Sequence, residues 1–176
     1  PMRIENTMSR QLRQLDKLPA GWKIWLQTQI MGRFVPFLKT AGLRFERISH
    51  EEVCVSVQNR KKIQNHINGV HACAMALLAE TATGFVTNMN TPDDKLILLK
   101  AMHINYTRRS VGNMRAVAQI NDEQAAMIAQ EERGNLVVPC TVYDDSGEQP
   151  VEVEMTWAWV PKQKKEDAAK ATEAAA

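Results

Sequence analysis

The feature that most constrains this chain is an apolar run from Val70 to Val86, in which Glu80 is the only formally charged residue. Alanine and leucine are good helix formers, and the run is too long for an ordinary strand. Apolar residues lie all round the helix, which predicts that it is buried. Since a membrane span needs about 20 apolar residues, the run predicts a helix inside a globular core. A carboxylate in such a helix must be paired, hydrogen-bonded or protonated, so Glu80 is the first candidate functional residue.

Length and composition indicate one globular domain. The chain has 176 residues, of which 44% are hydrophobic and 24% charged, and its net charge of +2 is too balanced to indicate a nucleic-acid partner. Cys54, Cys73 and Cys140 are far apart and form no CxxC pair, so neither a disulfide framework nor a metal site is expected. Residues 2–18 carry charged side chains throughout and contain no signal-peptide segment, so the expected location is cytoplasmic.

Two helices are expected before the apolar run. Residues 3–17 have apolar side chains spaced near the helical period, and a stronger helix runs from Trp22 to Met31, with apolar residues continuing to Leu38. We expect these helices to pack on the domain's own sheet. A membrane-surface anchor is the alternative, but basic residues are few and dispersed there, so stable membrane insertion is not expected.

Alternating apolar residues predict strands on both sides of the central helix. Two precede it, over residues 43–48 and 53–57, and four follow it in meander-like succession, over 95–108, 114–121, 136–143 and 151–159. Pro139 indicates an edge or a bulge within one of these strands. A short helix over residues 122–133 is expected to be capped by Asp122 and ended by Gly134.

These elements predict an α+β fold in which an antiparallel sheet wraps around one central helix. The chain divides into an N-terminal helical extension (1–40), the sheet domain (41–161) and a flexible tail (162–176). The tail is charged and rich in alanine and has no apolar periodicity, so it is not expected to dock on the domain.

Several residues lie at fixed spacings around the central helix, namely Asn65, Gly69, His71, Glu80 and Thr81. The histidine follows the asparagine by six positions and precedes the glutamate by nine. This pattern resembles the motif of hotdog-fold thioesterases of the phenylacetyl-CoA and 4-hydroxybenzoyl-CoA type, and the resemblance covers residues 40–161. The extra N-terminal helices resemble a branch of that superfamily known mainly as a domain of unknown function.

The resemblance implies hydrolysis of an acyl-CoA, aryl-CoA or acyl carrier thioester, with no cofactor beyond the coenzyme A of the substrate. Glu80 would activate water or attack directly, and the N–H groups of Ala72 and Cys73 at the helix N-terminus would stabilise the oxyanion. Asn65 and His71 would position the thioester or the water.

Further side chains are candidates for contact with the substrate. Two consecutive arginines, or the basic stretch 60–62, would bind CoA phosphates. The predicted substrate-binding residues are His66, Gly69, Met75, Thr81, Arg108 and Arg109. The predicted apolar lining for the acyl group is Met75, Leu78, Phe85, Met102 and Trp157.

Three departures from the family motif concern the central helix. Ala72-Cys73 replaces a Gly-Gly pair, Glu80 replaces the aspartate of the phenylacetyl-CoA branch, and Gly84 stands where the 4-hydroxybenzoyl-CoA branch can carry threonine. Cys73 is expected to be a small apolar residue rather than a nucleophile.

Two other functions stay open at this point. His66 and Glu80 are fourteen positions apart, as in hotdog β-hydroxyacyl dehydratases. A non-catalytic acyl-CoA-binding protein is the other alternative.

The spacing of the two principal catalytic groups predicts an oligomer. Ala72 and Glu80 are eight positions apart, about 12 Å along a helix, which is too far for one straight helix to serve one carbonyl. We therefore expect a homodimer, or a homotetramer built from dimers, in which two antiparallel helices build each active site from two subunits.

Overall fold

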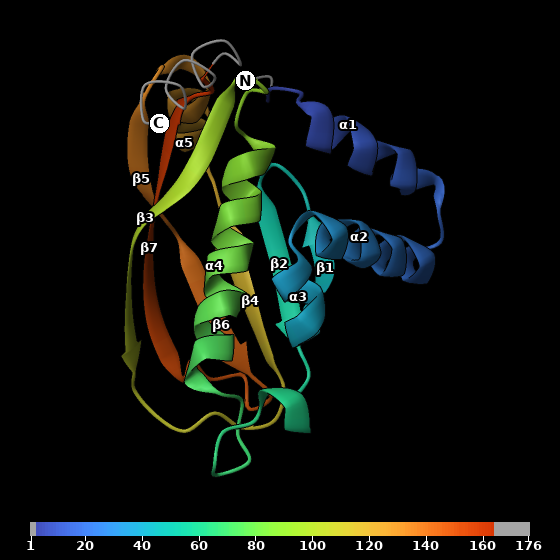
Figure 1. Cartoon of the computed structure of the whole chain (residues 1–176), viewed down its shortest axis with the longest axis vertical. Helices are drawn as coiled ribbons and strands as arrows, with labels where there is room; N and C mark the ends of the chain where they lie inside the picture. Colours follow the sequence, from blue (N-terminus) through green and yellow to red (C-terminus); the bar gives the residue numbers. More distant parts are fainter. Residues whose placement is uncertain (1–2, 164–176) are drawn as a thin grey trace, which may run out of the picture.

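The predicted central helix forms the middle of the molecule. A computed structural model describes residues 3–163 and places helix α4 (Ala72–Met89) inside a curved antiparallel sheet (Figure 1). Alternate residues of the strands face this helix, as at Val53 and Val55, which are fully buried. The expected α+β architecture, a sheet wrapped around one helix, is confirmed.

The other helices are α1 (Thr7–Arg13), α2 (Ala20–Phe34), α3 (Pro36–Ala41) and α5 (Asp122–Gln130), with short 3-10 turns η1 (Gln14–Lys17) and η2 (Lys61–Ile63). The strands are β1 (Arg44–Ile48), β2 (Glu52–Val57), β3 (Lys95–Tyr106), β4 (Met114–Gln119), β5 (Gly134–Val138), β6 (Cys140–Asp144) and β7 (Val151–Pro161).

The strand order corrects the expected meander. The sheet runs β1-β2-β4-β6-β7-β3, with β5 paired to β7, so β3 lies at the edge beside β7 and away from its successor β4. Pro139, where we expected an edge or a bulge, lies between β5 and β6 and divides the predicted strand over 136–143. Between α4 and residue 163, five strands are therefore present instead of the expected four.

The two edges of the sheet differ. Strand β1 is covered by α2, because the Phe45 N–H donates to Thr28 Oγ1 at 3.0 Å and Gln27 Nε2 donates to the Phe45 carbonyl at 2.6 Å. Strand β3 pairs only with β7 among the described residues, and it carries exposed Leu96 and Leu98 on one face. One edge is thus closed by side chains and the other is open.

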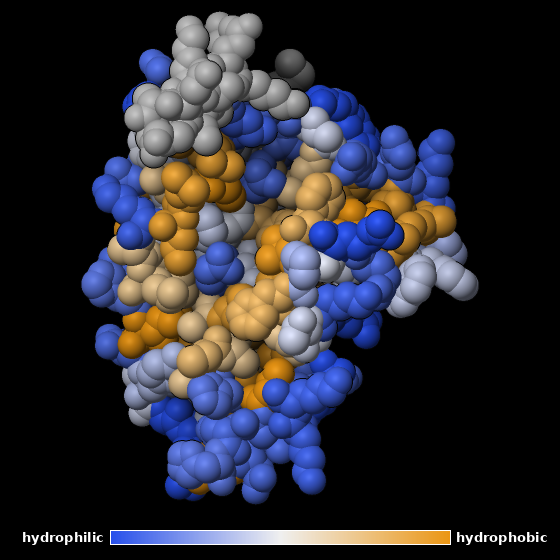
Figure 2. All heavy atoms as spheres, in the orientation of Figure 1, coloured by the Kyte–Doolittle hydropathy of each residue, from blue (hydrophilic) through white to orange (hydrophobic). Residues whose placement is uncertain are grey.

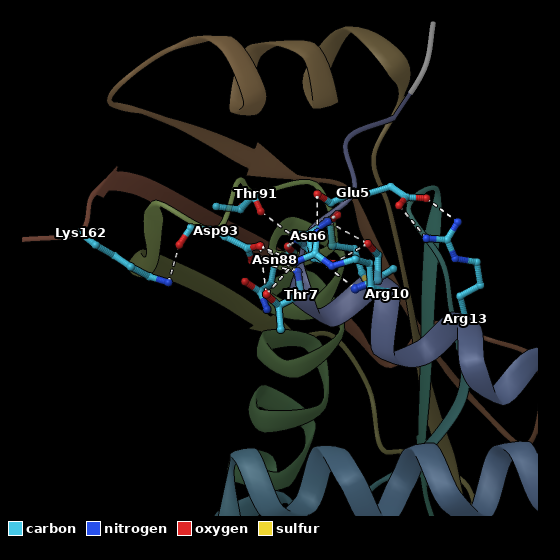
Figure 3. A network of polar contacts seen from close by, with 11 residues as sticks. Glu5, Asn6, Thr7, Arg10, Arg13, Asn88, Thr91, Asp93 and Lys162 are labelled. Atoms are coloured by element: carbon cyan, nitrogen blue, oxygen red, sulfur yellow. Dashed lines mark hydrogen bonds and ion pairs between the residues drawn. The ribbon is translucent and has the colours of Figure 1, made fainter.

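Polar contacts fasten the N-terminal helix to the end of α4 (Figure 3). The Asn6 side chain is buried, and its Nδ2 donates to the carbonyls of Asn88 at 2.7 Å and Thr91 at 2.8 Å. Its Oδ1 accepts from the Ser9 N–H and so caps α1. Since the last carbonyls of a helix lack partners within it, one asparagine stabilises two helix ends.

The second expected helix packs as predicted on one face only. Helix α2 buries Gln27 and Met31 against the domain, but Trp22 and Trp25 remain 66% and 55% exposed. Their rings meet edge to face with centroids 6.2 Å apart. None of the helices within residues 3–163 has the length and apolarity needed to cross a membrane.

The short helix α5 differs from expectation at both ends. Asn121, rather than Asp122, is its N-cap, because Asn121 Oδ1 accepts from the Gln124 N–H at 2.8 Å. The helix ends at Gln130, and Gly134 begins β5. Of the predicted tail, residues 164–176 lie outside the described residues.

Burial along α4 is uneven, which corrects the expectation of a helix buried all round. Ala72 and Cys73 are exposed and Glu80 is half-buried, whereas the stretch 81–87 is buried without interruption. One face of the first half of the helix therefore lies open, while Met75 and Leu78 on its other face and the whole stretch 81–87 lie in the core.

Candidate active site

Glu80 lies in the open half of α4 without a charged partner. Burial raises the pKa of its carboxyl above the usual value, and a hydrogen bond from Thr81 Oγ1 at 3.5 Å opposes this shift. No lysine or arginine within residues 3–163 forms an ion pair with it. A half-buried carboxyl with a raised pKa and no cation is suited to accept a proton.

The N-terminus of α4 is capped by His71. Its Nδ1 accepts from the Cys73 N–H at 3.1 Å, and its carbonyl accepts from the N–H groups of Ala74 and Met75. The Ala72 N–H has no acceptor among the described residues. Of the two predicted oxyanion donors, the cap therefore occupies one, Cys73, and leaves Ala72 available.

A tyrosine that was not among the predicted site residues, although it lies in a stretch that resembles the thioesterase family, contacts the start of this helix. Tyr106, at the end of β3, donates its hydroxyl to the Ala72 carbonyl at 2.9 Å. Burial raises the pKa of the Tyr106 hydroxyl, and nearby Cys73 raises it further. The contact holds the end of an edge strand against the helix terminus, and only a tertiary contact could reveal it.

Asn65 shapes the loop before the helix. Its Oδ1 accepts from the N–H groups of Ile67 and Gly69, each at 3.0 Å, and its own N–H donates to the Gly69 carbonyl at 2.9 Å. Its Nδ2 has no hydrogen-bond acceptor in the described part of the chain, because both side-chain bonds use Oδ1. Asn65 thus holds the loop in shape and keeps its side-chain NH₂ group free. His66, in the same loop, is exposed.

The two predicted arginines differ in their contacts, since Arg108 is bonded to the protein and Arg109 is exposed. Arg108 donates to Asp144 Oδ2 at 2.9 Å and to Ser146 Oγ at 2.8 Å, which ties the turn after β3 to the turn after β6. Burial would raise the pKa of Asp144, but hydrogen bonds from Ser146 and the Val111 N–H, together with Arg108, lower it. Arg109 is exposed and makes no ion pair within residues 3–163.

A pocket of 440 Å³ opens beside Glu80. Its walls come from α1, the α2–α3 junction, α4, β3 and β7. The apolar lining is Met8, Phe34, Val35, Leu38, Phe85, Pro92, Ile97 and Trp157. In Figure 2, apolar atoms gather over the middle of this face of the molecule.

Two residues of the predicted acyl lining border this pocket, and the others do not. Phe85 and Trp157 line this pocket, as does the predicted contact residue Thr81. Met75 and Leu78 lie instead in the hydrophobic core, and Met102 is exposed on β3. The contributions of α1 and the α2–α3 junction were missed, because nothing in a local pattern says which distant segment will cover a helix.

The structure explains why glycine stands four positions after Glu80. A Cβ at Gly84 would lie 2.7 Å from Trp157 Cζ2, closer than packed atoms approach. The same indole donates its Nε1–H to Thr83 Oγ1 at 2.8 Å. The large ring of β7 thus occupies the space that a side chain at this position would need.

The sheet wrapped around one helix, with a motif carboxylate on that helix, is a hotdog fold. Residues 23–160 match the family described as a domain of unknown function, DUF4442, and the chain belongs to this family. The match begins in α2, so part of the region that we assigned to an extension (1–40) is within the family's domain.

Solved structures with this fold cover most of the chain. A structural-genomics crystal structure is 25% identical over 88% of this chain and 99% of its own, with a TM-score of 0.68. A Pseudomonas aeruginosa protein described as a "probable thioesterase" is 19% identical over 82% and 97%, with a TM-score of 0.70. A thioesterase from Haemophilus influenzae is 11% identical over 81% and 93%, with a TM-score of 0.65. None of the curated proteins matches the sequence.

Proposed function

We propose that this protein hydrolyses acyl-CoA or aryl-CoA thioesters, with Glu80 as the base. The observation that carries the proposal is a half-buried carboxyl, raised in pKa and without a cation, at the side of an apolar pocket. The names of the similar proteins from Pseudomonas aeruginosa and Haemophilus influenzae support the same reaction. A thioester matches both features of the site. Its apolar acyl group would fit the pocket, and its carbonyl can be attacked by a water molecule that the carboxyl activates.

The proposed reaction uses groups already described. The Glu80 carboxylate takes a proton from water as the water oxygen attacks the thioester carbonyl. The carbonyl oxygen becomes an oxyanion and accepts a hydrogen bond from the Ala72 N–H, which has the favourable dipole of a helix N-terminus behind it. The C–S bond then breaks, the sulfur takes the proton from Glu80, and a carboxylic acid and coenzyme A leave. Direct attack by Glu80 on the carbonyl is the other route.

One chain cannot bring both groups to one carbonyl. Ala72 and Glu80 lie on the same helix, and eight residues at the helical rise separate them by about 12 Å. We therefore propose that Ala72 of one subunit faces Glu80 of another. The open edge of β3 supports this arrangement, because an uncovered edge strand pairs readily with another strand. The covered edge at β1 offers no such surface.

The first experiment measures thiol release from a panel of acyl-CoA and aryl-CoA thioesters. Glu80→Gln should lower kcat at least about 100-fold, since a general base contributes that much or more. Glu123→Gln, an exposed carboxylate on α5, is the matched control and should keep full activity. Release that survives Glu80→Gln would contradict the proposal. Hydration of crotonyl-CoA would instead identify a dehydratase, and tight binding without turnover a binding protein.

The second experiment tests sharing of the site between subunits. Ala72→Pro removes the proposed oxyanion donor. The helix should tolerate it, because Ala72 is the first helical residue and His71 before it already has an extended backbone, with φ −63° and ψ 142°.

Ala72→Pro and Glu80→Gln proteins should each be inactive, and unfolding and refolding them together should form mixed dimers. Half the dimers are then mixed and each has one intact site of two, so activity should return to about a quarter of wild type. If the subunits exchange and the mixture remains inactive, the site is not shared.

A further inference from the structure

The pocket beside Glu80 extends to segments that lie outside the sheet. It is bounded on one side by Phe85 of α4 and Trp157 of β7, and on the other by Met8 of α1 with Phe34 and Val35 where α2 ends. We propose that α1 and the α2–α3 junction form the far wall of the acyl site and select long, apolar acyl groups. This inference rests on the proposed function, because it assigns the substrate's acyl end to the pocket of Glu80.

Several polar side chains of the pocket on the side away from Glu80 are already bonded to the protein. Thr7 donates its N–H and its hydroxyl to Asp93, and Asn6 donates to the end of α4 (Figure 3). Lys95 Nζ donates to three carbonyls at the end of α5, at 2.7–3.0 Å, so only its aliphatic stem faces the pocket. A ligand with a polar tail would have to displace these bonds, whereas an alkyl or aryl tail would leave them intact.

The size of the pocket suits the same class of ligand. Its 440 Å³ falls within the range of about 300–1,000 Å³ that small-molecule sites occupy. Apolar side chains from α1, α2, α4, β3 and β7 surround it. Each additional buried methylene adds favourable free energy, so affinity should rise with chain length until the pocket is full.

Phe34 is the most direct probe of the far wall. It lines the pocket and is nevertheless 62% exposed, which is unusual for a phenylalanine and leaves its ring able to contact a ligand. Phe37, three residues on, is also 62% exposed but lies outside the pocket lining. The pair forms a matched control, since truncating either ring removes the same atoms from an equally exposed position.

The experiment measures binding rather than turnover. S-butyl-, S-octyl- and S-dodecyl-CoA thioethers cannot be hydrolysed, and their affinities are determined by titration calorimetry for each protein. In wild type the affinity should increase from butyl to dodecyl. Phe34→Ala should weaken dodecyl binding about tenfold and leave butyl binding unchanged, whereas Phe37→Ala should alter neither.

A second variant fills the pocket instead of opening it. Val35→Trp places a large ring at a position that is 40% exposed and extended in backbone, so the fold should accept it. It should lower dodecyl affinity and leave butyl affinity unchanged. The unchanged butyl affinity serves in each variant as the check that the protein is folded.

The results separate this inference from the proposed function. Affinity independent of chain length, equal effects of Phe34→Ala and Phe37→Ala, or full dodecyl affinity in Val35→Trp would each overturn the far-wall assignment. Chain-length-dependent binding without any hydrolysis would overturn the hydrolase proposal and leave the apolar site standing. Hydrolysis with no difference between the Phe34 and Phe37 variants would support the hydrolase proposal and overturn the far-wall assignment.

Discussion

The two halves of helix α4 meet their surroundings in opposite ways. In the C-terminal half, Asn90 Nδ2 donates to the carbonyls of Val86 and His50, and Asn6 donates to Asn88 and Thr91. In the N-terminal half, the Ala72 N–H and the Glu80 carboxyl have no strong partner in the described structure. One half is thus bonded into the fold, and the other leaves free the two groups that the proposed reaction would use.

Removing a capping side chain at each end of α4 should give the largest effects and should show most clearly how the two halves differ. Asn90→Ala deletes a buried side chain that makes three hydrogen bonds, including one accepted from Arg3 at 3.0 Å. It should cost about 2–3 kcal/mol, a fall in Tm of about 4–12 °C, with little change in kcat measured below the transition. His71→Ala should do the opposite, lowering activity about 10–100-fold at a cost of about 1 kcal/mol or less.

Calorimetric unfolding and thiol-release kinetics on the two variants check this crossed pattern. Equal losses of stability and activity in both would mean that the two ends of the helix do not differ in role.

Adding one carbon to the buried C-terminal half of α4 should have the next largest effect on stability. Gly84→Ala drives a Cβ into the Trp157 ring, which should cost about 1–3 kcal/mol through overpacking. Gly21→Ala in α2 is the matched control, because nothing lies within 4 Å of its added Cβ. There the better helix propensity of alanine should stabilise by up to about 1 kcal/mol. Denaturant midpoints that move the same way in both proteins would show that the ring can move aside.

The smallest expected effect concerns the charge of the Glu80 carboxylate in the N-terminal half of α4. Because the folded pKa of Glu80 is raised, its ionisation opposes folding, and this cost appears as pH rises from the usual 4.5 through the raised value. Glu80→Gln should therefore unfold at a slightly higher temperature than wild type at pH 7, while at pH 4 the two should nearly coincide. A Tm for Glu80→Gln below that of wild type at neutral pH would contradict the burial penalty.

The raised pKa of Glu80 should also affect the pH dependence of catalysis. If Glu80 acts as the base, kcat/KM should fall on the acid side with a midpoint above 4.5. A pH–rate profile that stays flat to below that value would exclude Glu80 as the titrating base.

The sequence determined the elements and their faces. Alternation of apolar and polar residues identified strands such as β7, and the apolar run identified α4, because side-chain period is a local consequence of backbone geometry. The missing N–H of Pro139 predicted an edge or a bulge, but the division into β5 and β6 was not predicted. The spacing of Asn65, His71 and Glu80 identified the motif helix before any contact was known.

Tertiary structure alone decided which atoms of that motif remain free and what surrounds them. The side chain of Asn6 meets the Asn88 carbonyl 82 positions away, and the Trp157 indole meets Thr83 across 74. No local period encodes such pairings, because they depend on which segment is brought over the helix once the sheet has closed. For the same reason the burial that raises the pKa of Glu80, and the far wall supplied by Phe34, emerged only when distant segments packed around one helix.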